Sequence, residues 1–415
     1  MNETAKPNIV CFLTDRLHLG YLGAYGNSWI GTPAFDRLAS ESILFDRAFA
    51  QSLSLPTLTR AFWTGEEPFR SRPAASASGK RVGFFGRLLA KGNPASSSPL
   101  FHALSAAGYR TLLLTDEAEI AELGGAFFDK TEFLSPAKVI AEVPEKSAFY
   151  RCMTTAGALA ARLDRTGGPF LLWIHLKGWN GVWDTPLSMR DGAREDDDDP
   201  PPYDGALPPS FEMPREGDDD LLRAVVETYA AGVRLWDGAL EVFLETLAER
   251  NLFDRTALFL GGARGLSLGE HRRVGIDGPG TLYFEEIHVP LLYRPAGKPS
   301  EAVRSFALCG SGDLYRALLR LAGDGTGEKT LLDLASEETV SIRSELAVTQ
   351  ADASSPRQGV MTDEWFLLSD RGQSHPRREL YLSPDDRWNV NEVADRGGEE
   401  LLDELERKID RGGFA

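Results

Sequence analysis

Short, largely apolar runs alternate with longer stretches of helical periodicity along most of the chain, and this alternation limits the folds it can adopt. Three such runs are residues 8–13 (NIVCFL), 169–175 (PFLLWIH) and 256–260 (TALFL). They lack the polar alternation of a strand with one solvated face, which indicates strands buried on both faces. Residues 219–249 carry apolar side chains at helical spacing over many turns. We therefore predict an α/β fold with a large, mostly parallel sheet between layers of helices.

The chain changes character near residue 330. Residues 365–369 (WFLLS) and 379–382 (ELYL), with a turn between them, have the pattern of antiparallel strands, and residues 399–409 that of an amphipathic helix. We therefore predict two units. An α/β domain covers residues 1–330, and a small C-terminal α+β subdomain covers residues 331–415.

Two segments follow neither a strand nor a helix period. Residues 66–99 are rich in Ser, Ala, Gly, Pro and Arg, and residues 191–219 contain runs of Asp and Pro. Both compositions favour surface loops. The acidic run lacks the alternating ligand and glycine spacing of a calcium loop, so we expect it to be solvated.

The overall charge and the cysteines limit which partners and which cellular compartment are expected for the protein. A net charge of −17 argues against nucleic acid and anionic membranes as partners, because both repel such a surface. Cys11, Cys152 and Cys309 are far apart and show no metal spacing, which fits a reducing compartment. No stretch approaches the about 18 apolar residues of a membrane span, and the first residues do not resemble a secretion signal. We expect a cytoplasmic protein.

A series of short motifs occurs in a fixed order along the chain. They are residues 7–15 (PNIVCFLTD), 21–26 (YLGAYG), 32–38 (TPAFDRL), 108–111 (GYRT), 268–271 (LGEH), 283–290 (YFEEIHVP), 379–381 (ELY) and 389–394 (NVNEVA). In this order they resemble the sulfatase family of the alkaline phosphatase superfamily over nearly the whole chain. The resemblance implies a large mixed sheet, mostly parallel and sandwiched by helices, and a small C-terminal four-stranded sheet with a helix.

The resemblance also implies a reaction, which uses a Ca²⁺ ion held by carboxylates and a Cys or Ser oxidised to formylglycine. The family's paired aspartates after the first strand are Asp15 and Arg16 here. Its second pair, an aspartate followed by a histidine or an asparagine, is Ala263 and Arg264. A hard dication needs about six oxygen ligands, several of them anionic. One carboxylate beside two repelling guanidiniums does not meet that need. We expect no metal, with Asp15 as the vestige of its site, and no other cofactor.

The nucleophile segment aligns with the family in three ways. A gapless match places Leu55 in the nucleophile position, and a match on Arg60 places Pro56 there. A match on the proline places Ser54 there, the only register with a usable hydroxyl. Ser54 or Thr57 is then a weak nucleophile without an evident activating base, or a cap of the following helix. We expect formylglycine to be absent.

Most cationic donors of the family's anion pocket are also replaced. The positions of a Lys and a His after the GYRT motif hold Asp116 and Ala118, and that of a second Lys holds Ile276. The family's active-site His falls near Asn180. A pocket that would stabilise a sulfate anion has thus lost most of its positive charge.

We favour the hypothesis that the protein is sulfatase-like but has lost sulfuric ester hydrolase activity, and is a pseudoenzyme. Arg16 and Arg264 then pair with Asp15 in place of the metal. Either the former pocket, with Asn180, binds a small anionic ligand or a partner's acidic side chain, or the arginines only neutralise Asp15 and fill the space.

The alternative hypothesis is a metal-independent hydrolase of sulfate or phosphate esters that uses Ser54 or Thr57. Two histidines are considered as its base. His271, in the LGEH motif, is preferred, because His175 lies within an apolar run, where a core histidine is more common. The charge clamp would be Arg16, Arg60 and Arg264.

A scaffold or regulatory role is compatible with the pseudoenzyme hypothesis. Trp179 and Trp183 lie beside the acidic segment. They are exposed as a docking surface, line the former substrate cleft or pack beneath that segment, and the sequence leaves these alternatives open.

Overall fold

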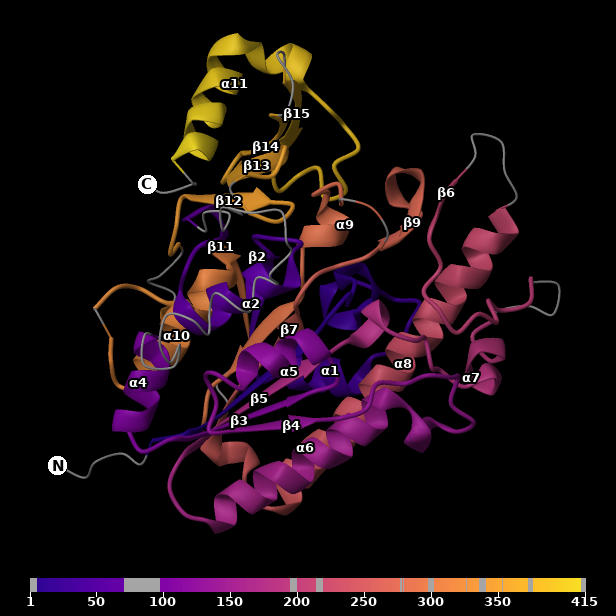
Figure 1. Cartoon of the computed structure of the whole chain (residues 1–415). Helices are drawn as coiled ribbons and strands as arrows, with labels where there is room; N and C mark the ends of the chain where they lie inside the picture. Colours follow the sequence, from indigo (N-terminus) through magenta and orange to yellow (C-terminus); the bar gives the residue numbers. More distant parts are fainter. Residues whose placement is uncertain are drawn as a thin grey trace, which may run out of the picture.

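A sheet of eight strands runs through the middle of the molecule (Figure 1). In spatial order the strands are β11 (Val303–Gly310), β2 (Ile43–Phe49), β10 (Leu291–Arg294), β7 (Thr256–Gly262), β1 (Asn8–Thr14), β5 (Phe170–Leu176), β3 (Arg110–Thr115) and β4 (Lys130–Phe133). All are parallel except β10, which is antiparallel to β2 and β7. The three apolar runs of the sequence are β1, β5 and β7, which are adjacent.

The computed structural model describes residues 6–411 with the exception of 71–97, 195–199, 214–218, 277, 279, 298–301, 326, 336–340, 353 and 372–375. Most of the loop predicted for residues 66–99 therefore lies outside the described residues, as do two parts of the loop predicted for residues 191–219. The described part between those two contains the two-residue strand β6 (Phe211–Glu212). β6 pairs with β9 (Arg273–Gly275), which pairs with β8 (Ser267–Leu268).

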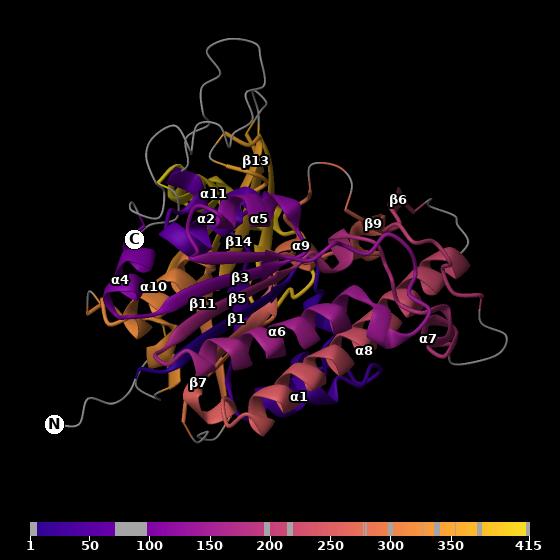
Figure 2. The ribbon, with the colours of Figure 1, turned by 60° about the horizontal axis from the view of Figure 1, so that its bottom comes forward.

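Helices cover both faces of the sheet (Figure 2). Alternate side chains of β1 point to opposite layers. Val10 and Phe12 pack with one layer, which consists of α1 (Pro33–Ala39), α6 (Ala148–Arg165) and α8 (Asp219–Glu249). Ile9, Cys11 and Leu13 pack with the other, which consists of α2 (Leu55–Thr64), α4 (Pro99–Ala106), α5 (Ala118–Gly124) and α10 (Ser311–Leu321). Because both faces are buried, every position of β1 is buried.

The long helix α8 is the one predicted for residues 219–249, and it lies beside α6 (Figure 2). Its apolar side is buried from Val225 to Leu247. Leu221, also predicted to face the core, is 49% exposed, because it belongs to the first turn, ahead of the packed part. Among the described helices, none combines the length and apolar character that a membrane crossing requires.

A small antiparallel sheet follows the main sheet at the top of Figure 1. It consists of β12 (Glu345–Thr349), β13 (Arg357–Thr362), β14 (Trp365–Asp370) and β15 (Arg377–Leu382), and α11 (Ala394–Asp410) covers it. Leu402, Leu405 and Ile409 of α11 pack against this sheet. Together with the large parallel sheet, this arrangement confirms the predicted fold class.

The structure decides between exposure and burial for the two tryptophans, and both side chains are buried. Trp179 and Trp183 are only 3% and 4% exposed, and their rings lie 4.8 and 5.8 Å from the ring of Tyr229 in α8. The indole N–H of Trp183 donates to the carbonyl of Trp179 at 3.1 Å. A docking surface on these rings is therefore wrong, because the segment folds back over α8.

The three cysteines lie in separate parts of the core. Cys11 belongs to β1, Cys152 to α6 and Cys309 to β11, and all three are free thiols. Burial raises the pKa of each thiol well above its ordinary value.

Candidate functional site

Charged residues gather where three parallel strands end side by side. Asp15 and Arg16 follow β1, Lys177 follows β5, and Ala263 and Arg264 follow β7. Because the strands are parallel neighbours, their carboxyl ends share one edge of the sheet, where α/β proteins commonly bind ligands. The sequence positions expected to hold a pocket are thus brought together.

Asp15 is fully buried, and Arg264 binds both of its carboxylate oxygens. Nε of Arg264 donates to Oδ1 at 2.9 Å and Nη2 donates to Oδ2. The third donor, Nη1, reaches the carbonyl of Leu53 at 2.5 Å. Burial alone would raise the pKa of Asp15, but the charge and hydrogen bonds of Arg264 hold it below its ordinary value. Arg264 therefore links the ends of β7 and β1 to the segment before α2.

Arg16 is buried without a comparable partner. Its Nη1 donates to the carbonyl of Gly265 at 3.0 Å, but its Nε is buried without a hydrogen-bond partner. Within the described residues no carboxylate forms an ion pair with it, and its backbone has φ of 62°, in the left-handed region. Burial, followed by the charge of Arg264, lowers the pKa of Arg16 to about 10, so it stays protonated at neutral pH.

A cavity of about 510 Å³ opens at this edge of the sheet. Arg16, Ser54, Lys177, Asn180 and Arg264 are among the residues that line it. Four of them are positions that the sequence singled out. The backbone of Asp15 approaches the turn after β5 closely at Gly178, where an added Cβ would lie 2.3 Å from the Asp15 carbonyl oxygen.

Three carboxylates on the cavity wall were missed from the sequence. Glu117 pairs with Lys177 at 3.1 Å. Glu286 accepts from the backbone N–H groups of Thr281 and Leu282 and lies 4.0 Å from Arg273. The remaining one is Glu119 in the first turn of α5. Their positions just after β3 and in the YFEEIHVP motif could have marked two of them.

The candidate nucleophiles lie at the start of α2. Ser54 is the residue before the helix and lines the cavity, but its side chain makes no capping bond to the helix. The hydroxyl of Thr57 donates to the Ser54 hydroxyl oxygen at 3.0 Å. Arg60 forms an ion pair with Glu66 and is not part of the cavity wall. Only Ser54 of these three therefore lies on the cavity with the arginines.

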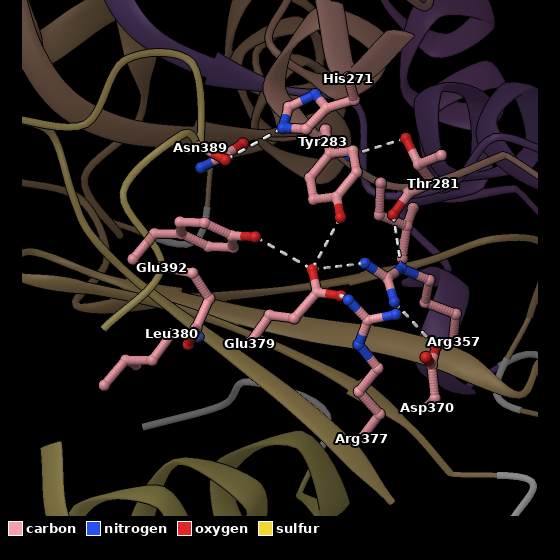
Figure 3. Close-up of polar contacts among 12 residues, drawn as sticks. His271, Thr281, Tyr283, Arg357, Asp370, Arg377, Glu379, Leu380, Asn389 and Glu392 are labelled. Carbon is pink, nitrogen blue, oxygen red and sulfur yellow. Dashed lines mark hydrogen bonds and ion pairs between the residues drawn. The ribbon is translucent and has the colours of Figure 1, made fainter. Parts of the chain in front are cut away.

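His271 lies in a polar network beneath the C-terminal sheet (Figure 3). Its Nδ1 is 2.9 Å from Oε1 of Glu285, and its Nε2 is 3.0 Å from the carbonyl oxygen of Asn389. Its ring stacks on Tyr283 with centroids 3.7 Å apart. Burial would lower the pKa of His271, but the hydrogen bond to Glu285 raises it above its ordinary value. Both partners offer acceptor oxygens, so these contacts favour the doubly protonated ring, which can donate at both nitrogens.

The same network joins the main domain to the C-terminal sheet (Figure 3). Glu379 accepts hydrogen bonds from the hydroxyls of Tyr283 and Tyr381, at 2.8 and 3.0 Å. Arg357 donates to the same carboxylate at 2.9 Å and to Asp370 at 2.9 Å. His271 thus belongs to a polar network that reaches the C-terminal sheet, and it is not among the described residues that line the cavity.

His175 is buried at the end of β5. Its Nε2 is buried without a hydrogen-bond partner, and burial lowers the pKa of His175 to about 4. Asp116, which the alignment places at a family Lys position, accepts from the backbone N–H of Lys177 at 2.7 Å. Burial raises the pKa of Asp116 to about 6. These groups shape the core behind the cavity and do not line it.

The donors around Asp15 do not fit a calcium ion. The Asp15 carboxylate is bound by Arg264, and Arg16 lies next to it in the chain with its own positive charge. Across residues 6–411, apart from the undescribed gaps, no group of three or more His, Cys, Asp or Glu side chains is placed to hold a metal. A hard dication needs several free anionic oxygens, which this position does not offer.

Comparison with known sequences gives one family over most of the chain. The family model described as Sulfatase matches residues 7–324. The chain is 35% identical over 115 residues to arylsulfatase H of Homo sapiens, which covers 28% of this chain and 20% of that protein. It is 40% identical over 77 residues to an ulvan-active sulfatase of Formosa agariphila, which covers 18% of this chain and 15% of that protein. These alignments thus span a fifth or less of the relatives' lengths.

Solved structures share the fold over almost the whole chain. A 2-O GAG sulfatase superposes with a TM-score of 0.70 at 17% identity, covering 98% of this chain and 91% of that one. The phosphonate monoester hydrolase of Agrobacterium radiobacter superposes with a TM-score of 0.67 at 15% identity, covering 97% and 95%. At these identities the likeness establishes the fold.

Proposed function

This chain belongs to the sulfatase family, and on that premise we propose that it is a non-hydrolytic member, a pseudoenzyme whose former reaction pocket binds a small anionic ligand. The observation that carries the proposal is the two-pronged bond from Arg264 to Asp15. The resemblance assigns the Asp15 carboxylate to a metal, and here a guanidinium of the chain itself binds it. This contact supports a protein that does not use the family's metal-dependent route.

Electrostatics support the same proposal. A dication placed beside Asp15 would meet the fixed positive charges of Arg16 and Arg264. At a separation of about 4 Å and an effective dielectric of about 20, a dication is repelled by about 8 kcal/mol for each such charge. One carboxylate already bound to Arg264 does not offset this repulsion.

A second candidate function is a metal-independent ester hydrolase, and it rests on Ser54. This hydroxyl lies on the same cavity as Arg16 and Arg264, which would stabilise a developing oxyanion. It ranks second because no histidine is among the described residues that line the cavity. His271 has both ring nitrogens bound elsewhere, so it does not serve as the base.

Ester turnover separates the two functions. The purified protein is incubated with an aryl sulfate and an aryl phosphate, beside Ser54→Ala and a Ser188→Ala control, which changes an exposed serine of α7 (Leu187–Asp191) outside the cavity wall. We expect no turnover above the background shared by all three proteins. Turnover that is lost only in Ser54→Ala would refute the pseudoenzyme and establish the hydrolase. Mass spectrometry of the peptide that contains Ser54 should show an unmodified serine.

We also propose a cytoplasmic location. It is supported by three free thiols in a chain whose core would accommodate no disulfide among them, since they lie in separate elements. Subcellular fractionation in the native host tests it, and recovery of the protein in a secreted or vesicular fraction would contradict it.

A further inference from the structure

The charges on the cavity wall can be paired off, and two remain. Arg264 pairs with Asp15, Lys177 with Glu117 at 3.1 Å, and Arg273 lies 4.0 Å from Glu286. The two that remain are Arg16 and Glu119. Within the described residues neither has an ion-pair partner.

Of these two residues, Arg16 gives the stronger evidence that the cavity binds a ligand. The residue is only 7% exposed, and its Nε is buried without a hydrogen-bond partner. Asp15 and Glu286 favour its charged form without contacting it, and no carboxylate of the described residues is close enough for an ion pair. A buried charge without a close counterion destabilises the fold, and a protein retains such a group where something else uses it. The arginine also adopts φ of 62°, a conformation that costs a non-glycine residue energy. The buried charge and the left-handed backbone conformation thus both destabilise the fold at one residue of the cavity wall.

Glu119 is half-buried on the same wall, in the first turn of α5. Burial, followed by the charge of Glu117, raises the pKa of Glu119 above its ordinary value. Arg264 and Lys177 favour its charged form, but neither forms an ion pair with it among the described residues. The cavity wall thus carries a donor that follows β1 and an acceptor in α5, each without a close partner in the described part of the chain.

We propose that the cavity binds a small organic molecule with one oxyanion, held by Arg16, and one hydroxyl or ammonium group, held by Glu119. This inference rests on the proposed function, because it names the ligand of the same pocket. A guanidinium beside an oxyanion forms charge-assisted hydrogen bonds, which are stronger than neutral ones. A carboxylate accepts from a hydroxyl or an ammonium in the same way.

The other wall residues restrict the class further. Lys177 and Arg264 are already paired, so they add little net attraction for a second anionic group. Glu117, Glu119 and Glu286 repel additional negative charge. The structure therefore favours a zwitterionic or hydroxylated monoanion over a polyanion.

Calorimetric titration with five small compounds tests this class. Ethanesulfonate, isethionate and taurine share one sulfonate and differ in the second group. Taurine, 2-aminoethylphosphonate and β-alanine share the ammonium and differ in the oxyanion, which separates sulfonate, phosphonate and carboxylate ligands. Ionic strength is held constant with chloride, because sulfonates and phosphonates stabilise proteins non-specifically. We expect isethionate or taurine to bind about tenfold more tightly than ethanesulfonate.

Two variants assign the two groups. Arg16→Asn removes the guanidinium with a residue that tolerates φ of 62°, and should weaken all binding by about tenfold or more. Arg16→Lys, which keeps the charge, should give an intermediate loss. Glu119→Gln should remove the advantage of taurine over ethanesulfonate. Arg37→Asn, which removes an exposed arginine paired with Glu241, is the matched control and should bind as the wild type does.

The stability of Arg16→Asn distinguishes a binding role from a structural one. If Arg16 serves a ligand, the variant loses binding but unfolds at the same or a higher temperature, since an unmatched buried charge is gone. No binding of any compound to the wild type, or equal binding to wild type and Arg16→Asn, would refute the inference. Absent binding with absent turnover leaves the pseudoenzyme standing, whereas binding with Ser54-dependent turnover refutes the pseudoenzyme and keeps the Arg16 site.

Discussion

Arg264, which follows β7, forms a bidentate ion pair with Asp15, which follows the neighbouring strand β1. Its Nε donates to Oδ1 at 2.9 Å, and its Nη2 donates to Oδ2. The two residues are 249 positions apart in sequence and are both buried. A buried pair of this kind is a weak source of net stability, but either partner left alone is costly. The pair therefore gives a direct prediction for single and double substitutions.

Arg264→Met should destabilise the protein by about 3–5 kcal/mol, because it leaves Asp15 charged, buried and unpaired. Chemical denaturation measures the loss. Asp15→Asn combined with Arg264→Met should recover part of it, since neither charge then remains. The control Arg37→Met breaks an exposed pair and should cost less than about 1 kcal/mol. Equal losses in the two arginine variants would contradict the prediction.

Calcium and chelators should leave the thermal unfolding of the wild type unchanged. The triple variant Arg16→Asp, Ala263→Asp and Arg264→Asn restores the carboxylates and amide that the family resemblance places at the ends of β1 and β7. It should gain a calcium-dependent increase in stability, about 2.7 kcal/mol when calcium is one hundred times its Kd. Stabilisation of the wild type by calcium would show that the strand ends hold the ion after all.

Two buried groups should change the pH dependence of stability in opposite directions. Unfolding frees His175 to titrate near 6.5 instead of about 4, so between these values the unfolded state binds more protons and stability rises with pH. Asp237, which accepts from the backbone N–H groups of Ala34 and Phe35, titrates at about 6 folded and 3.8 unfolded. Between these values the folded state binds more protons, and stability falls as pH rises.

Denaturant unfolding measured from pH 4 to 6.5 checks both signs. His175→Gln should make the slope of stability against pH less positive, and Asp237→Asn should make it more positive. Each change should approach the slope of one proton, about 1.4 kcal/mol per pH unit. Slopes that move together would show that one of the two shifts has the opposite sign.

Glu379→Ala should cost about 3 kcal/mol or more, because it leaves Arg357 and two tyrosine hydroxyls without their common acceptor (Figure 3). Glu399→Ala, which removes an exposed partner of Arg378, is the control and should cost less than about 1 kcal/mol. Equilibrium unfolding measures both. A small loss in Glu379→Ala would mean that water replaces its acceptor without strain.

Local patterns predicted the fold well, because they record burial on both faces. The apolar runs of β1, β5 and β7 and the period of α8 follow directly from their packing. The meeting of Asp15, Arg16 and Arg264 also followed, since parallel strands end at one edge. The local patterns did not predict which side chains contact each other across long distances in the sequence.

His271 shows why the candidate site was harder to predict. Its LGEH motif suggested a place near the reaction centre, but its ring is set by Asn389, which is 118 residues away. A single sequence carries no trace of that contact. The sequence left the exposure of Trp179 and Trp183 open for a similar reason, because their burial depends on α8. The start of α2 leaves the three registers open, because Ser54, Leu55 and Pro56 all line the cavity.

The three buried thiols can report local unfolding of the native protein. Alkylating reagents react with an accessible thiolate, and Cys11, Cys152 and Cys309 are neither accessible nor easily ionised while the fold is closed. They sit at the centre of the sheet, in one helical layer and at the sheet's edge strand. The alkylation rate of each cysteine would therefore show which of these three regions unfolds locally most readily, without an introduced probe.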